Sequence, residues 1–486
     1  MSLSNMLPLF ILLTAFVTAI VMFVVPEEKQ KLRTAINLVN AFVTIIMIFA
    51  LILGVYSGQT FELVFPLLPD INLVLHADPL SLMFVGLSGV LWFVTTIYAI
   101  GYLREAKHRS RFFGFFSLCV FATLGIAMAG NLITFLIFYE LLTLVTYPLV
   151  VHKGNDASLR AGKIYLRYTM VGGAVLLVGV VWLKSLAGAL DFSGAGDLVN
   201  MSHIPTSDLT IIFALLIIGL GVKAAIVPLH GWLPEAIAAP APVSSLLHAV
   251  AVVKAGAFGI IRVIYDVYGF EFADSLGVLF YVSIAAAVTI IYGSIRALYQ
   301  DDLKKRLAYS TVSQVSYVAL GASIGGPWAA TGAVAHLVHQ GIMKITMFFS
   351  AGNFAEALHI HKVSELDGVG RRMPLTMTAL TLAIFGMIGI PPLAGFVTKW
   401  YLGNGAIEQG QFWVLIVLMI SSLLNAMYLL PIVYRGWFKR PKVDWAAKPD
   451  SSKLEIYWML LIPPLITISF VVLAGLFAAS GYSPLY

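Results

Sequence analysis

Fourteen apolar stretches of 17 to 25 residues follow one another along the chain, separated by short polar connections. They lie near 5–25, 34–54, 80–102, 112–129, 131–151, 164–186, 209–229, 243–265, 275–295, 308–324, 328–352, 374–398, 411–434 and 457–478. Each is long enough to cross the hydrocarbon core of a bilayer as an α-helix. Segments of about ten residues with alternating polarity, which indicate a transmembrane barrel, do not occur. We therefore predict an all-α polytopic membrane protein with about 14 transmembrane helices.

The polar connections differ in charge according to their place in this series. Connections that follow odd-numbered stretches hold 24 of the 30 Lys and Arg residues, whereas many of the acids lie after even-numbered ones. Because cytoplasmic loops are enriched in Lys and Arg, we expect the odd connections at the cytoplasmic face. Both termini are then non-cytoplasmic.

The composition agrees with a single membrane domain over residues 1–486. Hydrophobic residues make up 60% of the chain and charged residues 11%, with a net charge of +6. The net charge comes from the basic connections, so it gives no reason to expect nucleic-acid binding. Cys119 is the one cysteine, which excludes an intrachain disulfide and a Cys-ligated cluster within the chain. The longest connections, 55–79 and 187–208, are too short for a soluble domain.

Two of the stretches contain prolines and glycines that interrupt a helix. One runs from Gly221 to Pro234 and the other from Gly386 to Lys399, and each contains a lysine. Paired broken helices indicate inverted repeats with the ion site near the breaks. On five-helix units, helices 4–8 (112–265) match helices 9–13 (275–436), with helices 1–3 (1–111) and helix 14 (457–478) outside the repeats. Two ordinary proline kinks are the alternative.

Five charged side chains lie inside the apolar stretches, where each costs about 2.5–3.5 kcal/mol on insertion scales. They are Glu140, Lys223, Lys254, Lys344 and Lys399. Glu140 is the one carboxylate well inside a stretch, and Lys223 is its most plausible partner. Paired buried groups of this kind can load and release a proton. The alternatives are a protonated, locally bonded Glu140, and snorkelling of Lys223 and Lys399 to the interface.

Four histidines accompany these charges. His336, His339 and Lys344 share one region of a helix, which suits a hydrated proton relay, while His248 lies six positions before Lys254. On a continuous helix that spacing makes His248 and Lys254 successive stations on a path but not one site. His230 lies within the first interrupted stretch, two residues after Pro228. His336 and His339 could also bind a metal, but no carboxylate or cysteine within the helix completes a ligand shell, so we expect no metal and no cofactor.

Several motifs occur in one order along the chain. They are Tyr139-Glu140-Leu-Leu, the stretch from Lys223 to Ala236, Ala239-Pro-Ala-Pro-Val-Ser-Ser-Leu246, Val253-Lys254-Ala-Gly, the stretch from Asp301 to Gln314, and Gly389-Ile-Pro-Pro-Leu-Ala-Gly-Phe-Val-Thr-Lys399. In this order they closely resemble the antiporter-like subunits shared by Mrp-type cation/proton antiporters, respiratory complex I and membrane-bound hydrogenases. The resemblance covers about residues 100–440.

The resemblance implies fourteen helices, inverted repeats and broken helices 7 and 12 in a prokaryotic inner-membrane protein. By analogy, Glu140 and Lys223 form an ion pair, Lys254 is the central lysine, and Lys399 ends the second half-channel. His248, His336 and Lys344 match the hydrophilic axis between them. Ala225 departs from the pattern, because many relatives have proline there, so we expect the first break later, at Pro228. Lys399 and the short C-terminal end resemble the D-type subunits of Mrp antiporters.

These observations favour a proton-translocating subunit of a multisubunit Na⁺/H⁺ antiporter. Its expected partners are a large A-like subunit and small B-, C-, E-, F- and G-like subunits, and its expected ions are protons and possibly Na⁺. The alternative is the same module in a membrane-bound hydrogenase or complex I-like enzyme, which nothing within the chain separates from the first. An integral-membrane enzyme would need clustered acids or histidines or an activated nucleophile, and the sequence supplies neither. A passive scaffold would tolerate loss of Glu140 and Lys223.

Overall fold

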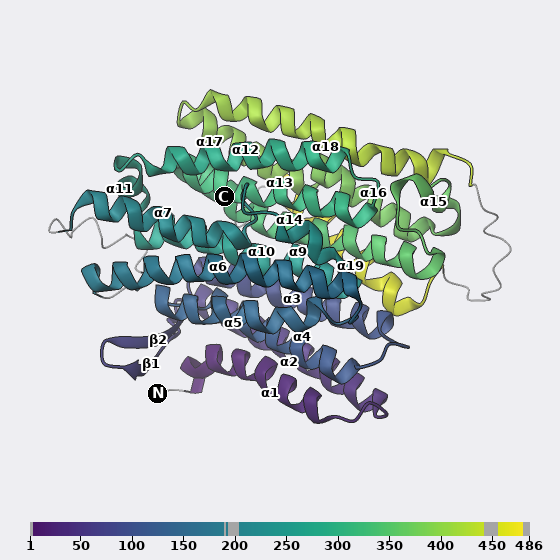
Figure 1. Cartoon of the computed structure of the whole chain (residues 1–486), viewed down its shortest axis with the longest axis horizontal. Helices are drawn as coiled ribbons and strands as arrows, with labels where there is room; N and C mark the ends of the chain where they lie inside the picture. The colour runs from purple at the N-terminus through teal and green to yellow at the C-terminus, as the bar shows by residue number, and fades with distance from the viewer. Residues whose placement is uncertain (1–2, 189–190, 193–203, 442–454, 480–486) are drawn as a thin grey trace.

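The structure, a computed structural model, describes residues 3–188, 191–192, 204–441 and 455–479. Long helices lie side by side along one direction and form most of this part of the chain (Figure 1). Up to the first break they are α1 (Leu7–Val24), α2 (Gln30–Tyr56), α3 (Pro79–Tyr102), α4 (Arg109–Ala127), α5 (Leu132–Val150), α6 (Asp156–Ala187) and α7 (Thr206–Lys223). After it come α8 (Trp232–Glu235), α9 (Ala241–Ala249), α10 (Val252–Arg262), α11 (Phe270–Ser275), α12 (Val278–Leu298), α13 (Leu303–Ile324), α14 (Gly326–Leu358), α15 (Val369–Arg372), α16 (Pro374–Ile388), α17 (Ala394–Glu408), α18 (Phe412–Phe438) and α19 (Trp458–Ala479).

The all-α polytopic class predicted from the sequence is confirmed. Eleven helices in the described part are long and apolar enough to cross a membrane. α13 and α14, with 22 and 33 residues, are also long but carry many polar side chains. α16 and α17 have 15 residues each and meet at a break. The number 14 and the division into repeats stay predictions.

Both predicted breaks are present, although the first begins earlier than expected. α7 ends at Lys223 itself and not at Pro228, and Ala225 takes a left-handed conformation with φ of 58°. The indole of Trp232 then donates a hydrogen bond to the carbonyl of Val222 at 2.7 Å. The turn therefore forms without a proline at position 225, and the Val222 carbonyl at the end of the helix accepts both this indole and the backbone N–H of Ala225.

The second break separates α16 from α17 and is held by a lysine. Gly389 caps α16 with φ of 96°, a conformation that glycine adopts without a steric penalty. Lys399 reaches back from α17 and donates to the carbonyls of Met387 and Ile388 at 3.3 and 2.7 Å. The break thus places an ammonium group on the free end of a helix, where cations are favoured.

A third break divides the eighth apolar stretch, which we expected to form one helix. α9 ends at Ala249 and α10 begins at Val252, and a π-helical turn over Val263–Val267 follows α10. The break lies between His248 and Lys254. The angular separation that a continuous helix gives these two residues therefore does not apply.

One connection contains a β-hairpin that the sequence pattern did not indicate. β1 (Glu62–Leu68) pairs antiparallel with β2 (Ile71–His76), in the register Leu68↔Ile71. The hairpin packs on α5, because the side chain of Thr134 accepts a hydrogen bond from the backbone of Val74 at 2.8 Å.

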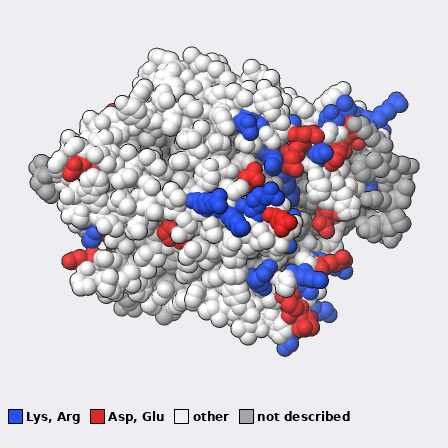
Figure 2. Space-filling model, viewed as in Figure 1, with Lys and Arg blue, Asp and Glu red and all other residues white. Residues whose placement is uncertain are grey.

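Apolar side chains cover the outside of the bundle, whereas the middle helices are enclosed. α2 and α18 expose rows that include Phe49, Met419 and Leu423, but every residue of α9 and α10 is buried. On the face shown in Figure 2, charged side chains gather toward the end of the molecule where α15 lies. Among the described residues, the Lys, Arg, Asp and Glu side chains that are buried are Arg33, Lys223, Lys254, Arg262, Arg306, Lys344 and Asp367.

Candidate functional site

The first group of buried charges lies between α5 and α7. Lys223 is 1% exposed, and its ammonium donates a hydrogen bond to the carbonyl of Tyr139. The same ammonium lies 3.3 Å from the centre of the Tyr139 ring, within cation–π range. The Lys223 side chain therefore stays inside the bundle. Its ammonium contacts Tyr139, the residue that precedes Glu140.

The carboxylate of Glu140 makes no direct contact with Lys223. Glu140 is half-buried, and its Oε1 atom has no hydrogen-bond partner in the described part of the chain. A Cβ atom at Gly173 of α6 would overlap this carboxylate, so the glycine leaves the space that Glu140 occupies. Glu140 and Lys223, which we predicted to form an ion pair, are thus linked through Tyr139. This residue precedes Glu140 in the sequence and contacts the Lys223 ammonium.

The centre of the molecule contains His248 and Lys254, both fully buried. The His248 ring stacks on Phe348 with 4.5 Å between ring centres, and neither ring nitrogen has a hydrogen-bond partner in the described part. The ammonium nitrogen of Lys254 also has none there. Buried polar atoms of this kind usually bind ordered water.

α14 carries the third group, His336, His339, Gln340 and Lys344, and all four are buried. Nδ1 of His336 lies 3.0 Å from Oγ1 of Thr398, and the ring stacks on Tyr317 with 5.0 Å between centres. The polar atoms of the Gln340 side chain have no partner among the described residues.

His339 points toward the second break. Its Nδ1 lies 3.1 Å from the carbonyl oxygen of Ala394, the first residue of α17. In the described residues no three His, Cys, Asp or Glu side chains come together in a way that could hold a metal ion. His336 and His339 therefore have no third protein ligand in that part of the chain.

A hydrogen-bonded chain connects Lys344 with Lys399. The Lys344 ammonium donates to Oγ of Ser310 at 2.5 Å, and that oxygen lies 2.8 Å from the Tyr428 hydroxyl. The Tyr428 hydroxyl lies 2.6 Å from Oδ1 of Asn425. Nδ2 of Asn425 donates at 3.4 Å to the Met387 carbonyl, which also accepts from Lys399.

Sequence reasoning found the lysines of this chain but missed the groups between them. Ser422, Asn425 and Tyr428 recur every three residues along α18, and Lys399 also donates to Ser422 at 2.9 Å. Polar residues at that spacing in an apolar helix mark one polar face. This signal could have indicated that α18 contributes to the site.

His230 lies apart from these groups. It is half-buried, its ring centre lies 5.0 Å from that of Tyr292, and its Nδ1 has no partner in the described residues. The structure gives it no contact with Lys223 or Glu140, so its place on a path stays a prediction.

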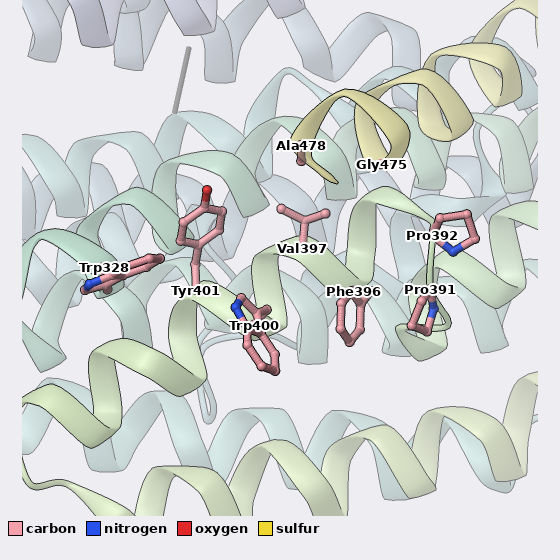
Figure 3. Close-up of a pocket in the computed structure, with 9 residues that line it drawn as sticks. All are labelled: Trp328, Pro391, Pro392, Phe396, Val397, Trp400, Tyr401, Gly475 and Ala478. Atoms are coloured by element: carbon pink, nitrogen blue, oxygen red, sulfur yellow. The ribbon is translucent and has the colours of Figure 1, made fainter. Parts of the chain in front are cut away.

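An apolar groove of about 390 Å³ lies at the second break, and its lining includes none of the side chains of the polar chain. Figure 3 shows the rings of Trp328, Tyr401, Phe396 and Trp400 along it, with Pro391 and Pro392 at one end. Its lining is largely apolar and has few groups that could bind an ion. We therefore do not assign this groove to the candidate site.

Two family models match the chain. The model described as "NADH:quinone oxidoreductase/Mrp antiporter, TM" matches residues 129–425, and "NADH-Ubiquinone oxidoreductase (complex I), chain 5 N-terminus" matches residues 69–113. The first covers more than half of the chain and includes Glu140, Lys223, Lys254, Lys344 and Lys399.

Curated relatives come from two kinds of complex. The chain is 33% identical over 425 residues to NADH-quinone oxidoreductase subunit N of Desulforudis audaxviator, covering 84% of this chain and 83% of that protein. It is 30% identical over 390 residues to a probable K⁺/H⁺ antiporter protein of Rhizobium meliloti, of the A/B type, covering 78% of this chain but 38% of that protein.

Two solved structures share the fold. A chain of the archaeal membrane-bound sulfane sulfur reductase aligns with a TM-score of 0.86 at 23% identity, over 99% of this chain and 95% of that one. A chain of the Mrp complex from Dietzia sp. aligns with a TM-score of 0.83 at 20% identity, over 100% and 98%. The predicted family resemblance is therefore confirmed, and the chain belongs to the NADH:quinone oxidoreductase/Mrp antiporter transmembrane family.

Proposed function

We propose that the protein is the proton-translocating subunit of a multisubunit monovalent cation/proton antiporter. The observation that carries the proposal is the row of ionisable groups inside the bundle, which runs from half-buried Glu140 through the buried Lys223, Lys254 and Lys344 to half-buried Lys399. Intramembrane charges are costly and usually mark an ion pathway. A stable fold does not need several such charges on neighbouring helices, because each of them has an energetic cost.

The chemistry of the row favours protons as the transported ion. Lysine and histidine can release and take up a proton, whereas an alkali cation needs several oxygen ligands. Glu140 supplies the one carboxylate of the row, so we place the Na⁺ path in a partner subunit. Atoms without protein partners at His248, Lys254 and Gln340 are suited to bind the water that joins the charged groups.

Membership of a hetero-oligomeric membrane complex follows from the family and from its structural neighbours. We further propose that the partners are A-like and small Mrp-type subunits. α2 and α18 lie toward opposite edges of the bundle in Figure 1, and each exposes apolar side chains that we propose as lateral contact surfaces. The charged end of Figure 2 is proposed to face the cytoplasm.

Substitution of the first charged pair tests the proposal. Glu140→Gln and Lys223→Met keep side-chain volume but remove the charge, so we expect Na⁺/H⁺ exchange in everted vesicles to fall about 100-fold or more, as with loss of a general acid–base group. Lys163→Met, an exposed lysine of α6, is the control and should leave exchange unchanged. Normal exchange by an assembled complex carrying Glu140→Gln would refute the proposal.

A second candidate function is the same proton module in a redox-driven complex. The NADH-quinone oxidoreductase relative, 33% identical over 84% of this chain, favours it. The two functions differ in the companion subunits. Purification of the native complex should recover large antiporter subunits without iron–sulfur proteins, whereas recovery of iron–sulfur or nickel subunits would establish the redox-driven pump.

A further inference from the structure

The connection between Lys344 and Lys399 includes two hydroxyls, of Ser310 and Tyr428, that can exchange donor and acceptor roles by rotation of the O–H bond alone. Ser310, Asn425, Tyr428 and Lys344 are all fully buried, so bulk water does not compete for their hydrogen bonds. The four side chains come from α13, α18 and α14. Lys399 on α17 joins them through the carbonyl of Met387.

The number of hydrogens in this chain allows two orders. The Tyr428 hydroxyl has a single hydrogen and lies within bonding distance of both Ser310 and Asn425, so it can donate to only one of them. A charged Lys344 has no lone pair and must donate to Ser310. Ser310 then donates to Tyr428, and Tyr428 donates to Oδ1 of Asn425.

A neutral Lys344 permits the opposite order. Its nitrogen can accept from Ser310, which then accepts from Tyr428, so that Oδ1 of Asn425 loses its donor. The amide of Asn425 is next to the Met387 carbonyl that binds Lys399. An Asn425 carbonyl oxygen without a donor leaves partial negative charge unpaired on the side chain that shares the Met387 carbonyl with Lys399, and this favours the charged form of Lys399.

We infer that Ser310, Tyr428 and Asn425 form a hydroxyl switch that couples the two lysines and favours a charge on one of them at a time. The inference rests on the proposed function, because it concerns the transfer of charge between two members of the row. The three residues are positioning residues, which act through Lys344 and Lys399. Apart from the proton that each lysine gains or loses, no covalent bond forms or breaks, and each hydroxyl only exchanges its donor and acceptor roles.

Tyr428→Phe removes the hydroxyl and keeps the ring. We expect it to slow Na⁺/H⁺ exchange about five- to tenfold in the assembled complex, since one hydrogen bond in a charged network is lost. Tyr434→Phe is the matched control, because Tyr434 is exposed on the same helix, and its rate should equal that of the unmodified protein.

A double variant separates coupling from ordinary loss of stability. Ser310→Ala and Tyr428→Phe interrupt the same connection, so the double variant should be no slower than either single variant. Ser310→Thr retains a hydroxyl and should keep more activity than Ser310→Ala. Independent structural effects would instead multiply, and the two serine substitutions would be equally slow.

Three results would overturn the inference. One is an unchanged rate in assembled Tyr428→Phe, another is a double variant slowed by the product of the single effects, and the third is loss of complex assembly in both single variants. Exchange that is lost in Glu140→Gln but normal in Tyr428→Phe would leave the proposed function standing and remove only the switch.

Discussion

Lys254 shows most clearly what a buried charge means in this molecule. Its side chain is fully buried in α10, and its nitrogen has no partner in the described residues. Desolvation disfavours a charged amine, and an unmade hydrogen bond costs about 1–3 kcal/mol even for a neutral polar group. A residue that weakens the fold in this way is expected to be kept for transport.

Lys254→Met should therefore separate stability from activity. Methionine fills similar space without a polar atom, so we expect the melting temperature of the purified complex to stay equal or rise. Na⁺/H⁺ exchange should fall about 100-fold, as expected for a lost proton-transfer group. Thermal unfolding and vesicle exchange, with Lys163→Met measured in parallel, check both parts. A lower melting temperature with normal exchange would assign Lys254 to the fold.

The charged residues could be predicted from sequence, whereas their hydroxyl and amide partners could not. A lysine inside an apolar stretch is conspicuous because insertion disfavours it. Ser310 and Thr398 are different, since serine and threonine in membrane helices often bond only to the preceding turn. Their role depends on which helices pack together, and that information is tertiary.

At the scale of helices, Lys399 holds the second break as well as lying on the row. Its ammonium donates to two carbonyls at the end of α16 and to Ser422 of α18. A carboxylate cannot donate these bonds and would repel the carbonyl oxygens. The two roles of Lys399, structural and ionic, should therefore respond differently to substitution.

We expect Lys399→Arg to keep the complex assembled, because arginine still donates to carbonyls, but to exchange slowly because arginine does not release its proton. Lys399→Glu should impair exchange and also lower the melting temperature. Vesicle exchange and thermal unfolding of the two variants make the comparison. A normal exchange rate in Lys399→Glu would remove Lys399 from the path.

A network of ion pairs joins the start of α3 to α10. It lies at the end of the bundle that is opposite the basic connections in the predicted topology. Arg262, 2% exposed, donates to Asp78 at 2.6 and 2.9 Å and to Asp266 in the π-helical turn at 2.7 Å. Burial raises the pKa of Asp78, but the hydrogen bonds and charge of Arg262 outweigh it, and the pKa lies below its ordinary value. The ion pair thus stabilises the fold only while Asp78 is ionised.

The stability of the fold should consequently depend on pH through the ionisation of Asp78. Because the pKa of Asp78 is lower in the folded than in the unfolded protein, its contribution is complete above the unfolded value near 4 and is lost as the pH falls through the folded value. We expect Asp78→Asn to cost about 3–5 kcal/mol at neutral pH, as for one broken buried pair, and to weaken the acid dependence. Asp274→Asn, an exposed acid, is the control for thermal unfolding at several pH values. An unchanged melting temperature in Asp78→Asn would contradict this role.

Two breaks could be predicted because proline and glycine mark them, but the break between α9 and α10 has neither residue. Gly341 of α14 lies against it, since a Cβ there would be 2.7 Å from the Ala249 carbonyl at the break. This close approach of another helix is a tertiary feature, which the pattern within the eighth stretch does not contain. The hairpin was missed for a different reason: Pro66 lies inside β1, and proline argues against a strand.

For the whole molecule, the distribution of charge sets the expected orientation. Most Lys and Arg residues follow odd-numbered stretches, and the charged side chains in Figure 2 gather toward one end. The row of buried groups can move protons across the membrane only if its two ends open on opposite sides. The direction of proton transport therefore depends on how the protein is oriented in the membrane.

Single cysteines can test the orientation, because the one native cysteine, Cys119, is buried and should not react. Lys107 and Asp274 are both exposed and lie in connections of opposite predicted side. We expect Lys107→Cys to react with an impermeant maleimide in everted vesicles and Asp274→Cys only in right-side-out ones. Labelling of both from the same side would contradict the predicted topology, whereas labelling of each from the side opposite to the expected one would invert it and place the termini in the cytoplasm. In the inverted case the row and its hydrogen bonds would be unchanged, and only the direction of proton movement through Lys344 and Lys399 would have to be reversed.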